Sequence, residues 1–447
     1  MLPRQIQRIV GPVAGIIFYI LIQPSLAVAA GGDGPEGGPT LIGMPIEFFF
    51  FGLTLLGVAI FHQRNFEVAV VGLGMILAYK LIVLDLDLIS HLWHEWHLLL
   101  NLFGLLLGFA ILARHFEESR FPEWLPKWLP DNWTGGFVLL VLVAVLSTFL
   151  DNIAAAIIGG VMAKKLYKNR VSVGYLAAIV AASNAGGAGS VIGDTTTTMM
   201  WIAGVPALDV AKAFVAMVPA VLFSGVIAGR LQHKLQPIQK DPPKDLEIDH
   251  ARMLIVALII GGAIAANVLL GFPAVGVWVA ILLGGLIRPT PWGAISGALK
   301  GSVFLISLVL SASLMPVNTL PDPSWQTAFA LGFVSAVFDN IPLTALALFQ
   351  GGYDWGVLAY TVGYGGSMIW FGSSAGVAIT NIFPEAKNTA LWLKEGWHVA
   401  VAYVIGFFVM LALAGWNPDG LDPLGLNFRE LTLARAVTAL ATPDDWL

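Results

Sequence analysis

The sequence has no cysteine and very little charge. Of its 447 residues, 57% are hydrophobic and 11% are Asp, Glu, Lys or Arg. A soluble domain carries about 25% charged residues, so this chain cannot cover a water-facing surface of ordinary size. The lack of cysteine excludes disulfides, thiolate metal sites and cysteine nucleophiles. A net charge of −5 does not indicate a nucleic-acid partner. The composition excludes a soluble enzyme and predicts an all-α polytopic membrane protein.

Most of the chain divides into apolar stretches long enough to cross a bilayer. A hydrocarbon core about 30 Å thick needs roughly 20 apolar residues per helix. Plain spans are predicted at 9–29, 45–62, 66–84, 98–114, 206–229, 252–270, 272–288, 295–315 and 396–415.

Four further apolar segments are interrupted. Segments 136–163 and 325–350 are too long for one span and carry an Asp-Asn pair. Segments 171–204 and 355–380 contain Gly-rich polar stretches. Irregular backbone at membrane depth is tolerated where it is buried in protein or lines a cavity. We therefore expect the first two segments to be re-entrant hairpins and the other two to be broken helices with an unwound middle.

The positive charges support this arrangement. Cytoplasmic loops hold the excess of Lys and Arg in membrane proteins. With the N-terminus inside and each hairpin returning to its own side, 19 of the 23 positive residues are cytoplasmic. A single crossing by 136–163 would move the cluster at 164–170 to the outside, so the hairpin is favoured.

Five regions follow from this topology. Residues 1–44 form a first transmembrane segment or a cleavable signal, because Arg4 and Arg8 precede a short apolar run and Ala27-Val28-Ala29 resembles a cleavage site. Both alternatives stay open. The other regions are a first repeat at 45–229, a cytoplasmic linker at 230–251, a second repeat at 252–415 and a C-terminal tail at 416–447.

Two motifs recur in the two repeats. A Ser-x-x-x-Asp-Asn pattern begins at Ser147 and again at Ser335. Gly186-Gly187 with Gly193-Asp194 has the same spacing as Gly365-Gly366 with Gly372-Ser373. The charge pattern orients the two halves oppositely, which predicts an inverted repeat, a recurring plan of secondary transporters. In that plan, corresponding broken helices form the substrate site near the bilayer midplane.

The candidate site consists of the polar groups of these interrupted segments. The expected cation- and proton-binding residues are Asp151, Asn152, Asp194, Asp339, Asn340, Ser183, Asn184, Thr195, Ser373 and Ser374. The expected unwound backbone comprises Gly186, Gly187, Gly193, Gly365, Gly366 and Gly372. A carboxylate within hydrocarbon costs at least about 2.5–3.5 kcal/mol, so helix capping alone is a weak reason for three acids.

A second cluster is formed by His91, His94 and His97, which share one helical face. This segment lacks a His-Glu-x-x-His motif. Trp and His at a predicted interface more commonly act as anchors, so no metal beyond the transported cation is expected. Glu395 and His398 border the last helix, where a proton relay is weakly supported.

The stretches SNAGGAGSVIGDTTTTMMW, STFLDNIAA, SAVFDNIPLTALAL and YGGSMIWFGSSAGVAI resemble the D-type (NhaD-like) bacterial sodium/proton antiporters. These belong to an ion transporter superfamily that also holds arsenite, citrate and dicarboxylate carriers. The resemblance covers both hairpins and both broken helices, and its general layout extends over about 45–415. It implies an elevator-type transporter, often a homodimer, in which a mobile domain slides against a scaffold.

Two function hypotheses remain. The first is Na⁺ (or Li⁺)/H⁺ antiport across the bacterial inner membrane, in which hard cations and protons compete for carboxylate oxygens. The second is transport of an anion such as citrate, a dicarboxylate or arsenite, which half-helix N-termini can hold. An intramembrane aspartyl protease is disfavoured because the Gly-x-Gly-Asp form is missing, and no P-loop supports an ATP-driven pump. Neither hypothesis requires a cofactor, and the expected partners are monovalent cations, protons and the lipid bilayer.

Overall fold

The computed structural model describes residues 39–41, 43–61, 64–240 and 247–418. The predicted first span or signal and nearly all of the predicted C-terminal tail lie outside these residues. A two-residue antiparallel ladder, β1 (Thr40–Leu41) with β2 (Met44–Pro45), precedes the first described helix. In the described residues that follow, the regular secondary structure is helical.

The predicted plain spans are confirmed as helices wherever the structure describes them. They are α2 (Ile46–Ile60), α3 (Asn65–Val83), α4 (Leu88–Glu118), α11 (Phe214–Leu235), α12 (His250–Leu270), α13 (Pro273–Gly284), α14 (Gly293–Ser313) and α20 (Trp397–Ala414). Among the described residues, six helices are long and apolar enough to cross a membrane, one of them counted as 207–235 across a short interruption.

Two of these spans differ most from the prediction. Helix α4 begins ten residues before the predicted span at 98, because Asp87 accepts hydrogen bonds from the backbone N–H groups of Ile89 and Ser90 and caps it there. The predicted span 206–229 is divided into a short α10 (Ala207–Ala211) and α11.

The four interrupted segments each form two helices separated by a break. The Asp-Asn segments are α6 (Trp133–Ser147) with α7 (Asn152–Leu166), and α15 (Trp325–Ser335) with α16 (Asn340–Gln350). The Gly-rich segments are α8 (Val173–Ala188) with α9 (Thr195–Ile202), and α17 (Trp355–Gly365) with α18 (Ser374–Ile382). The order of plain helices, broken pairs and closing helix therefore occurs twice along the chain.

Short elements connect these units. They are α5 (Phe121–Trp124), η2 (Leu125–Trp128), η3 (Val317–Thr319), η4 (Pro384–Lys387) and α19 (Thr389–Glu395).

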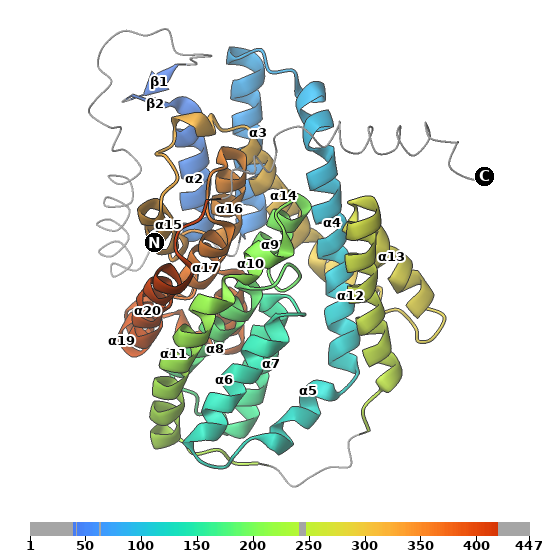
Figure 1. Cartoon of the computed structure of the whole chain (residues 1–447), viewed down its shortest axis with the longest axis vertical. Coiled ribbons are helices and arrows are strands. Elements are labelled where there is room, and N and C mark those ends of the chain that lie inside the picture. The colour runs from blue at the N-terminus through green and yellow to red at the C-terminus, as the bar shows by residue number, and fades with distance from the viewer. Residues whose placement is uncertain (1–38, 42, 62–63, 241–246, 419–447) are drawn as a thin grey trace, which may run out of the picture.

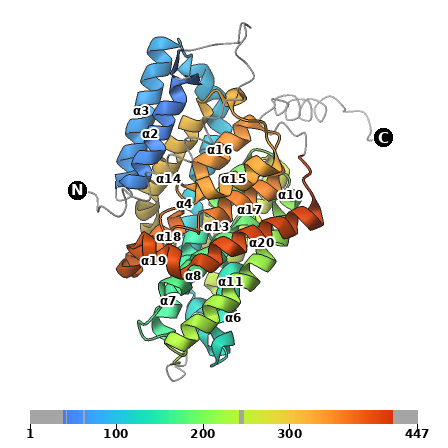
Figure 2. The same cartoon turned by 90° about the vertical axis from the view of Figure 1, so that its left-hand side faces the viewer.

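The helices form two groups that meet around the breaks (Figure 1). Helices α2, α3, α4, α12, α13 and α14 pack mainly on one another, with α14 against both α3 and α4. The second group is built around α8, which packs against α6, α7, α11 and α17, while α20 crosses α11 and α17. It also contains α9, α15 and α16, which contact α17, and α18, which contacts α7 and α8. Figure 2 shows α2 and α3 side by side at one edge, and α20 running obliquely over the second group. We call the first group the outer helices and the second group the core helices.

Candidate functional site

Four helices of the core begin at the breaks, and each begins at a polar residue expected in the site. Asp151, Asp194, Asp339 and Ser373 are the N-caps of α7, α9, α16 and α18. The unpaired N–H groups of a helix N-terminus carry a partial positive charge. The site is therefore surrounded by four partial positive charges and contains three carboxylates.

The N-caps correspond in pairs. The backbone of Asp151 has φ −53° and ψ 141°, and that of Asp339 has φ −54° and ψ 141°. Asp194 has φ −146° and ψ 143°, and Ser373 has φ −144° and ψ 153°. The repeated motifs thus adopt the same local conformation in both halves, with a serine in the second half where the first has an acid.

Glycine lets the backbones of neighbouring segments touch at the breaks. A methyl group added to Gly193 would overlap the carbonyl oxygen of Ser147, and one added to Gly372 would lie 2.5 Å from that of Ala336. Gly186 of α8 and Gly365 of α17 approach backbone carbonyls of α6 and α15 in the same way, although both glycines lie inside a helix and not in a break. Every break is therefore packed against the other broken segment of its half.

A buried amide network joins the two halves. The side-chain amide of Asn152 donates to Asp194 Oδ2 (2.6 Å) and to Asn184 Oδ1 (3.1 Å). Asn184 in turn donates to the hydroxyl oxygens of Ser367 (3.0 Å) and Ser373 (3.1 Å). Asp194 Oδ1 accepts from both the backbone N–H and the hydroxyl of Thr196, each at 2.8 Å. This network holds the caps of α9 and α18 against each other.

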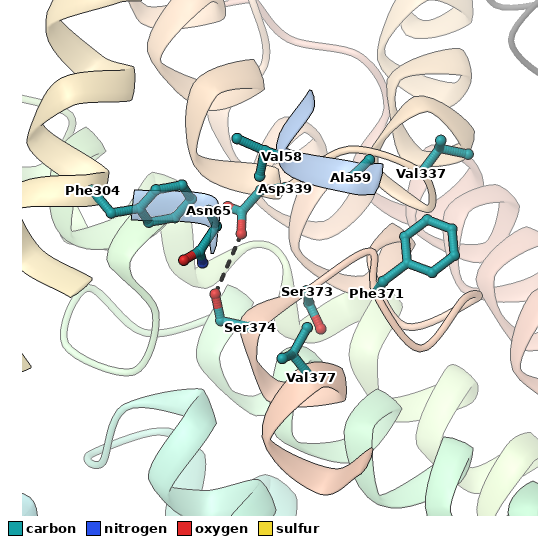
Figure 3. Close-up of a pocket in the computed structure, with 10 residues that line it drawn as sticks. All are labelled: Val58, Ala59, Asn65, Phe304, Val337, Asp339, Phe371, Ser373, Ser374 and Val377. Carbon is teal, nitrogen blue, oxygen red and sulfur yellow. Dashed lines mark hydrogen bonds between the residues drawn. The ribbon is translucent and has the colours of Figure 1, made fainter. Parts of the chain in front are cut away.

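The third acid lies beside a small pocket. Asp339 Oδ1 accepts from the backbone N–H of Ile341 (3.1 Å), and Oδ2 accepts from the Ser374 hydroxyl (3.3 Å). Figure 3 shows this pair at a pocket of about 130 Å³. The pocket is lined by Val58, Ala59, Asn65, Phe304, Val337, Asp339, Phe371, Ser373, Ser374 and Val377. Among the described residues that line the pocket, Asp339 is the only charged one.

The structure brings most of the expected ligands together, with exceptions. Asn340 is buried in the first turn of α16 and Asp151 is partly buried at the start of α7. The Ser183 hydroxyl instead donates to the carbonyl of Val180 in its own helix (2.9 Å). The threonine that donates hydrogen bonds to Asp194 is Thr196 and not the expected Thr195.

The expected unwound glycines divide into two groups. Gly193, Gly366 and Gly372 lie in the breaks. The expectation was wrong for Gly186, Gly187 and Gly365, which are helical residues of α8 and α17. Their function is close packing, and small residues serve that purpose in membrane helices as well.

Three polar residues of the site were not predicted: Thr196, Ser367 and Asn65. Thr196 and Ser367 are neighbours of predicted residues in motifs already singled out. Asn65 starts α3 on the far wall of the pocket, and a lone Asn after a span carries no pattern that would have identified it.

The histidines of the predicted cluster contact different neighbours. His91 Nε2 lies 2.9 Å from the Ser313 hydroxyl, whereas the His97 ring packs edge-on against Phe272. Within the described ranges, no group of three or more His, Asp or Glu side chains is placed to hold a metal ion.

Comparisons with known proteins agree with the predicted resemblance. The citrate transporter (CitMHS) family model matches residues 25–363. Sodium/proton antiporter 1 of Arabidopsis thaliana is 28% identical over 61% of this chain, and the match spans about half (52%) of that relative. The Na⁺/H⁺ antiporter NhaD of Alkalimonas amylolytica is 25% identical over 83% of this chain and 90% of its own length. NhaD of Vibrio cholerae is also 25% identical, over 69% of this chain and 78% of its own length.

These matches explain the features described above. A transporter family, together with the six long apolar helices found in the described part of the chain, identifies a multi-pass membrane protein rather than an intramembrane enzyme. The repeated Asp-Asn and Gly-rich motifs lie within or close to the residues that the family model matches, and the match to the Alkalimonas amylolytica relative covers 83% of the chain. The chain therefore belongs to the citrate transporter family and is an NhaD-like member of the ion transporter superfamily.

Proposed function

We propose that the protein is a secondary transporter that exchanges Na⁺ or Li⁺ for H⁺ across the bacterial inner membrane. The observation that carries the proposal is the grouping of Asp151, Asp194 and Asp339 at helix breaks, amid amide and hydroxyl oxygens. Hard monovalent cations prefer such oxygen ligands. The relatives named as Na⁺/H⁺ antiporters support the same exchange.

Antiport follows from competition at the carboxylates. Burial and neighbouring negative charge both disfavour the ionised form of an acid, whereas a bound cation favours it. Cation binding therefore releases protons, and proton binding expels the cation. Because the acids interact, their protons leave in coupled steps that belong to the cluster.

The proposal includes a mechanism and topology. Repeats 45–229 and 252–415 would be inverted relative to each other, with re-entrant hairpins at the Asp-Asn breaks and a cytoplasmic linker at 230–251. The core helices would move as an elevator against the outer helices, with Asp151, Asn152, Asp194, Asp339, Asn340 and the amide network at the midplane. Assembly as a homodimer belongs to the same proposal.

A second candidate is transport of an anion such as citrate, a dicarboxylate or arsenite. The family name and the four helix N-termini at the site favour it. Two observations oppose it: the acids would repel a polyanion, and a 130 Å³ pocket is small compared with the roughly 300–1,000 Å³ of typical small-molecule sites.

Proton flux in inverted membrane vesicles tests the two candidates. Na⁺, Li⁺, K⁺ and Ca²⁺ are added in turn to vesicles that carry a respiration-driven pH gradient, with and without citrate. Antiport predicts that Na⁺ or Li⁺ alone collapses the gradient. Flux that requires citrate would support the anion carrier, and vesicles that lack the protein provide the inactive control.

A further inference from the structure

The pocket beside Asp339 lies between the two groups of helices. One wall comes from the outer helices, with Val58 and Ala59 at the end of α2, Asn65 at the start of α3, and Phe304 on α14. The opposite wall comes from the breaks of the second half of the core. A side chain on the first wall therefore contacts the site only while the outer helices and the core helices keep this relative position.

Asn65 is the polar residue of the first wall. Its carbonyl Oδ1 accepts a hydrogen bond from the backbone N–H of Phe66 at 2.8 Å. A carbonyl oxygen has two lone pairs, so Oδ1 retains capacity for another partner. Figure 3 shows the Asn65 amide directed into the same pocket as the Asp339 carboxylate and the Ser374 hydroxyl.

The α2–α3 hairpin holds Asn65 in place. Buried Glu47 of α2 pairs with Lys80 of α3 at 3.3 Å. Gly57 and Gly72 allow the two helices to approach closely, because a methyl group at either position would collide with Val68 or Thr54. Asn65 therefore sits on a packed hairpin rather than on an isolated loop end.

The size and lining of the pocket fit a partly hydrated monovalent cation. Its 130 Å³ is several times the roughly 10–15 Å³ that one water molecule needs by this measure, so a cation fits together with some of its water. The apolar side chains of Val58, Phe304, Phe371 and Val377 surround the oxygens of Asn65, Asp339 and Ser374. A cation that enters loses water on the apolar side and gains protein oxygens on the polar side.

We propose that this pocket is the cation's approach to Asp339 and that Asn65 is a cation-contacting residue supplied by the outer helices. The inference rests on the proposed function, because it names the route by which the exchanged Na⁺ or Li⁺ reaches the core. It adds a contact from outside the motifs of the two repeats. Asn65 contacts the cation while the pocket is open between the outer and core helices, and this contact is lost when the core helices move.

Chemical labelling tests the route without any transport measurement. Because the chain has no cysteine, Asn65→Cys and Ala59→Cys each introduce a single thiol. Ala181→Cys in α8 is the control, since Ala181 is fully buried. We expect Asn65→Cys and Ala59→Cys to react with a membrane-impermeant methanethiosulfonate from one face of the membrane only. A cationic reagent should react faster than an anionic one, and Ala181→Cys should not react. Equal labelling from both faces, faster reaction of the anionic reagent, or no labelling at Asn65→Cys would overturn the proposed route.

Transport by Asn65 variants tests the contact itself. Asn65→Leu should raise the Na⁺ concentration for half-maximal exchange by roughly tenfold, the low end for loss of a contact to a charged group. Asn65→Ser, which keeps an oxygen, should recover part of that loss. Asn267→Leu, the same change at a half-buried asparagine of α12, should behave as wild type. Unchanged Na⁺ dependence in Asn65→Leu would refute the contact even if antiport is confirmed. One-sided cationic labelling in a protein without Na⁺ exchange would retain the route and reject the exchange.

Discussion

Asn184 of α8 donates a hydrogen bond to the hydroxyl of Ser373, the residue that caps α18, across 3.1 Å. One residue of the first half thereby holds the broken helix of the second half. The same side chain accepts from Asn152 and also donates to Ser367. Asn184 is therefore the point at which the two repeats share a single polar site.

This relationship predicts a strong effect of Asn184→Ala. The change removes the hydrogen bonds that Asn184 donates to Ser367 and Ser373 in the second half. It also removes the oxygen of Asn184 that accepts from Asn152. Each buried hydrogen-bonding group left unpaired costs about 1–3 kcal/mol, so we expect exchange activity to fall at least tenfold. Ser183→Ala is the neighbouring control, because the Ser183 hydroxyl bonds only within α8 in the contacts described. Equal losses in both variants, measured by proton flux in vesicles, would contradict the bridging role.

The two matched acids should both be required. We expect Asp151→Ala and Asp339→Ala to abolish exchange while membrane insertion, followed by fluorescence of a C-terminal fusion, stays normal. Each substitution removes a carboxylate from one half of a shared site. If one variant transports at the wild-type rate, the acid in that half serves packing and capping only.

Acid should weaken cation binding. As the pH falls, protons bind the carboxylates and neutralise the ligands that hold Na⁺, so the sign of the effect is a loss of affinity toward low pH. Displacement of one proton per cation predicts about a tenfold change in apparent Kd per pH unit. Calorimetry on purified protein in buffers of different ionisation enthalpy measures both the affinity and the protons released. Binding that is independent of pH and releases no proton would reject this mechanism.

Gly193 should tolerate no side chain. Gly193→Ala forces a methyl group into the carbonyl oxygen of Ser147, and overpacking of this kind typically costs about 1–3 kcal/mol. Gly297→Ala on α14 is the matched control, since nothing lies within 4 Å of the added carbon. We expect a lower thermal midpoint in detergent for Gly193→Ala alone. Similar midpoints for the two variants would show that the break can relax.

The inverted repeat predicts the location of three loops. Tags near Lys168 and Lys240 should be cytoplasmic, and a tag near Pro321 should be periplasmic. The prediction rests on the distribution of positive residues between the two sides. Accessibility of each tag to an impermeant reagent in whole cells gives the answer, and Lys168 and Pro321 on one side would exclude the inverted arrangement.

The helices and breaks were predictable because their signals are local. Apolar length marks α12 and α14, and an Asp-Asn pair inside an apolar run marks the ends of α6 and α7. The extension of α4 back to Leu88 was not predicted because a 31-residue helix, about 46 Å long, exceeds the roughly 30 Å hydrocarbon thickness that a single span must cross.

The contacts within the site were less predictable because they join residues distant in the sequence. Nothing near Ser367 indicates that Asn184 will donate to it. Asn65 shares a pocket with Asp339 only because α2 and α3 pack beside the core. A glycine is expected both where helices pack closely and where a helix unwinds, so the sequence alone does not assign Gly186 to one of these roles. The contact with the carbonyl of Ala144 assigns it to packing.

The four helix N-termini at the breaks have a consequence for how ion selectivity evolves. The partial positive charges of the helix N-termini attract negative charge, and in the proposed cation exchange the side chains of Asp151, Asp194 and Asp339 reverse that preference. The second half already carries Ser373 where the first carries Asp194. A few exchanges between acid and hydroxyl at the caps would therefore invert the sign of the favoured ion while the helices stay in place. On the proposed function, the same arrangement of helices suits ions of either sign, and the residues at the four caps decide which sign is bound.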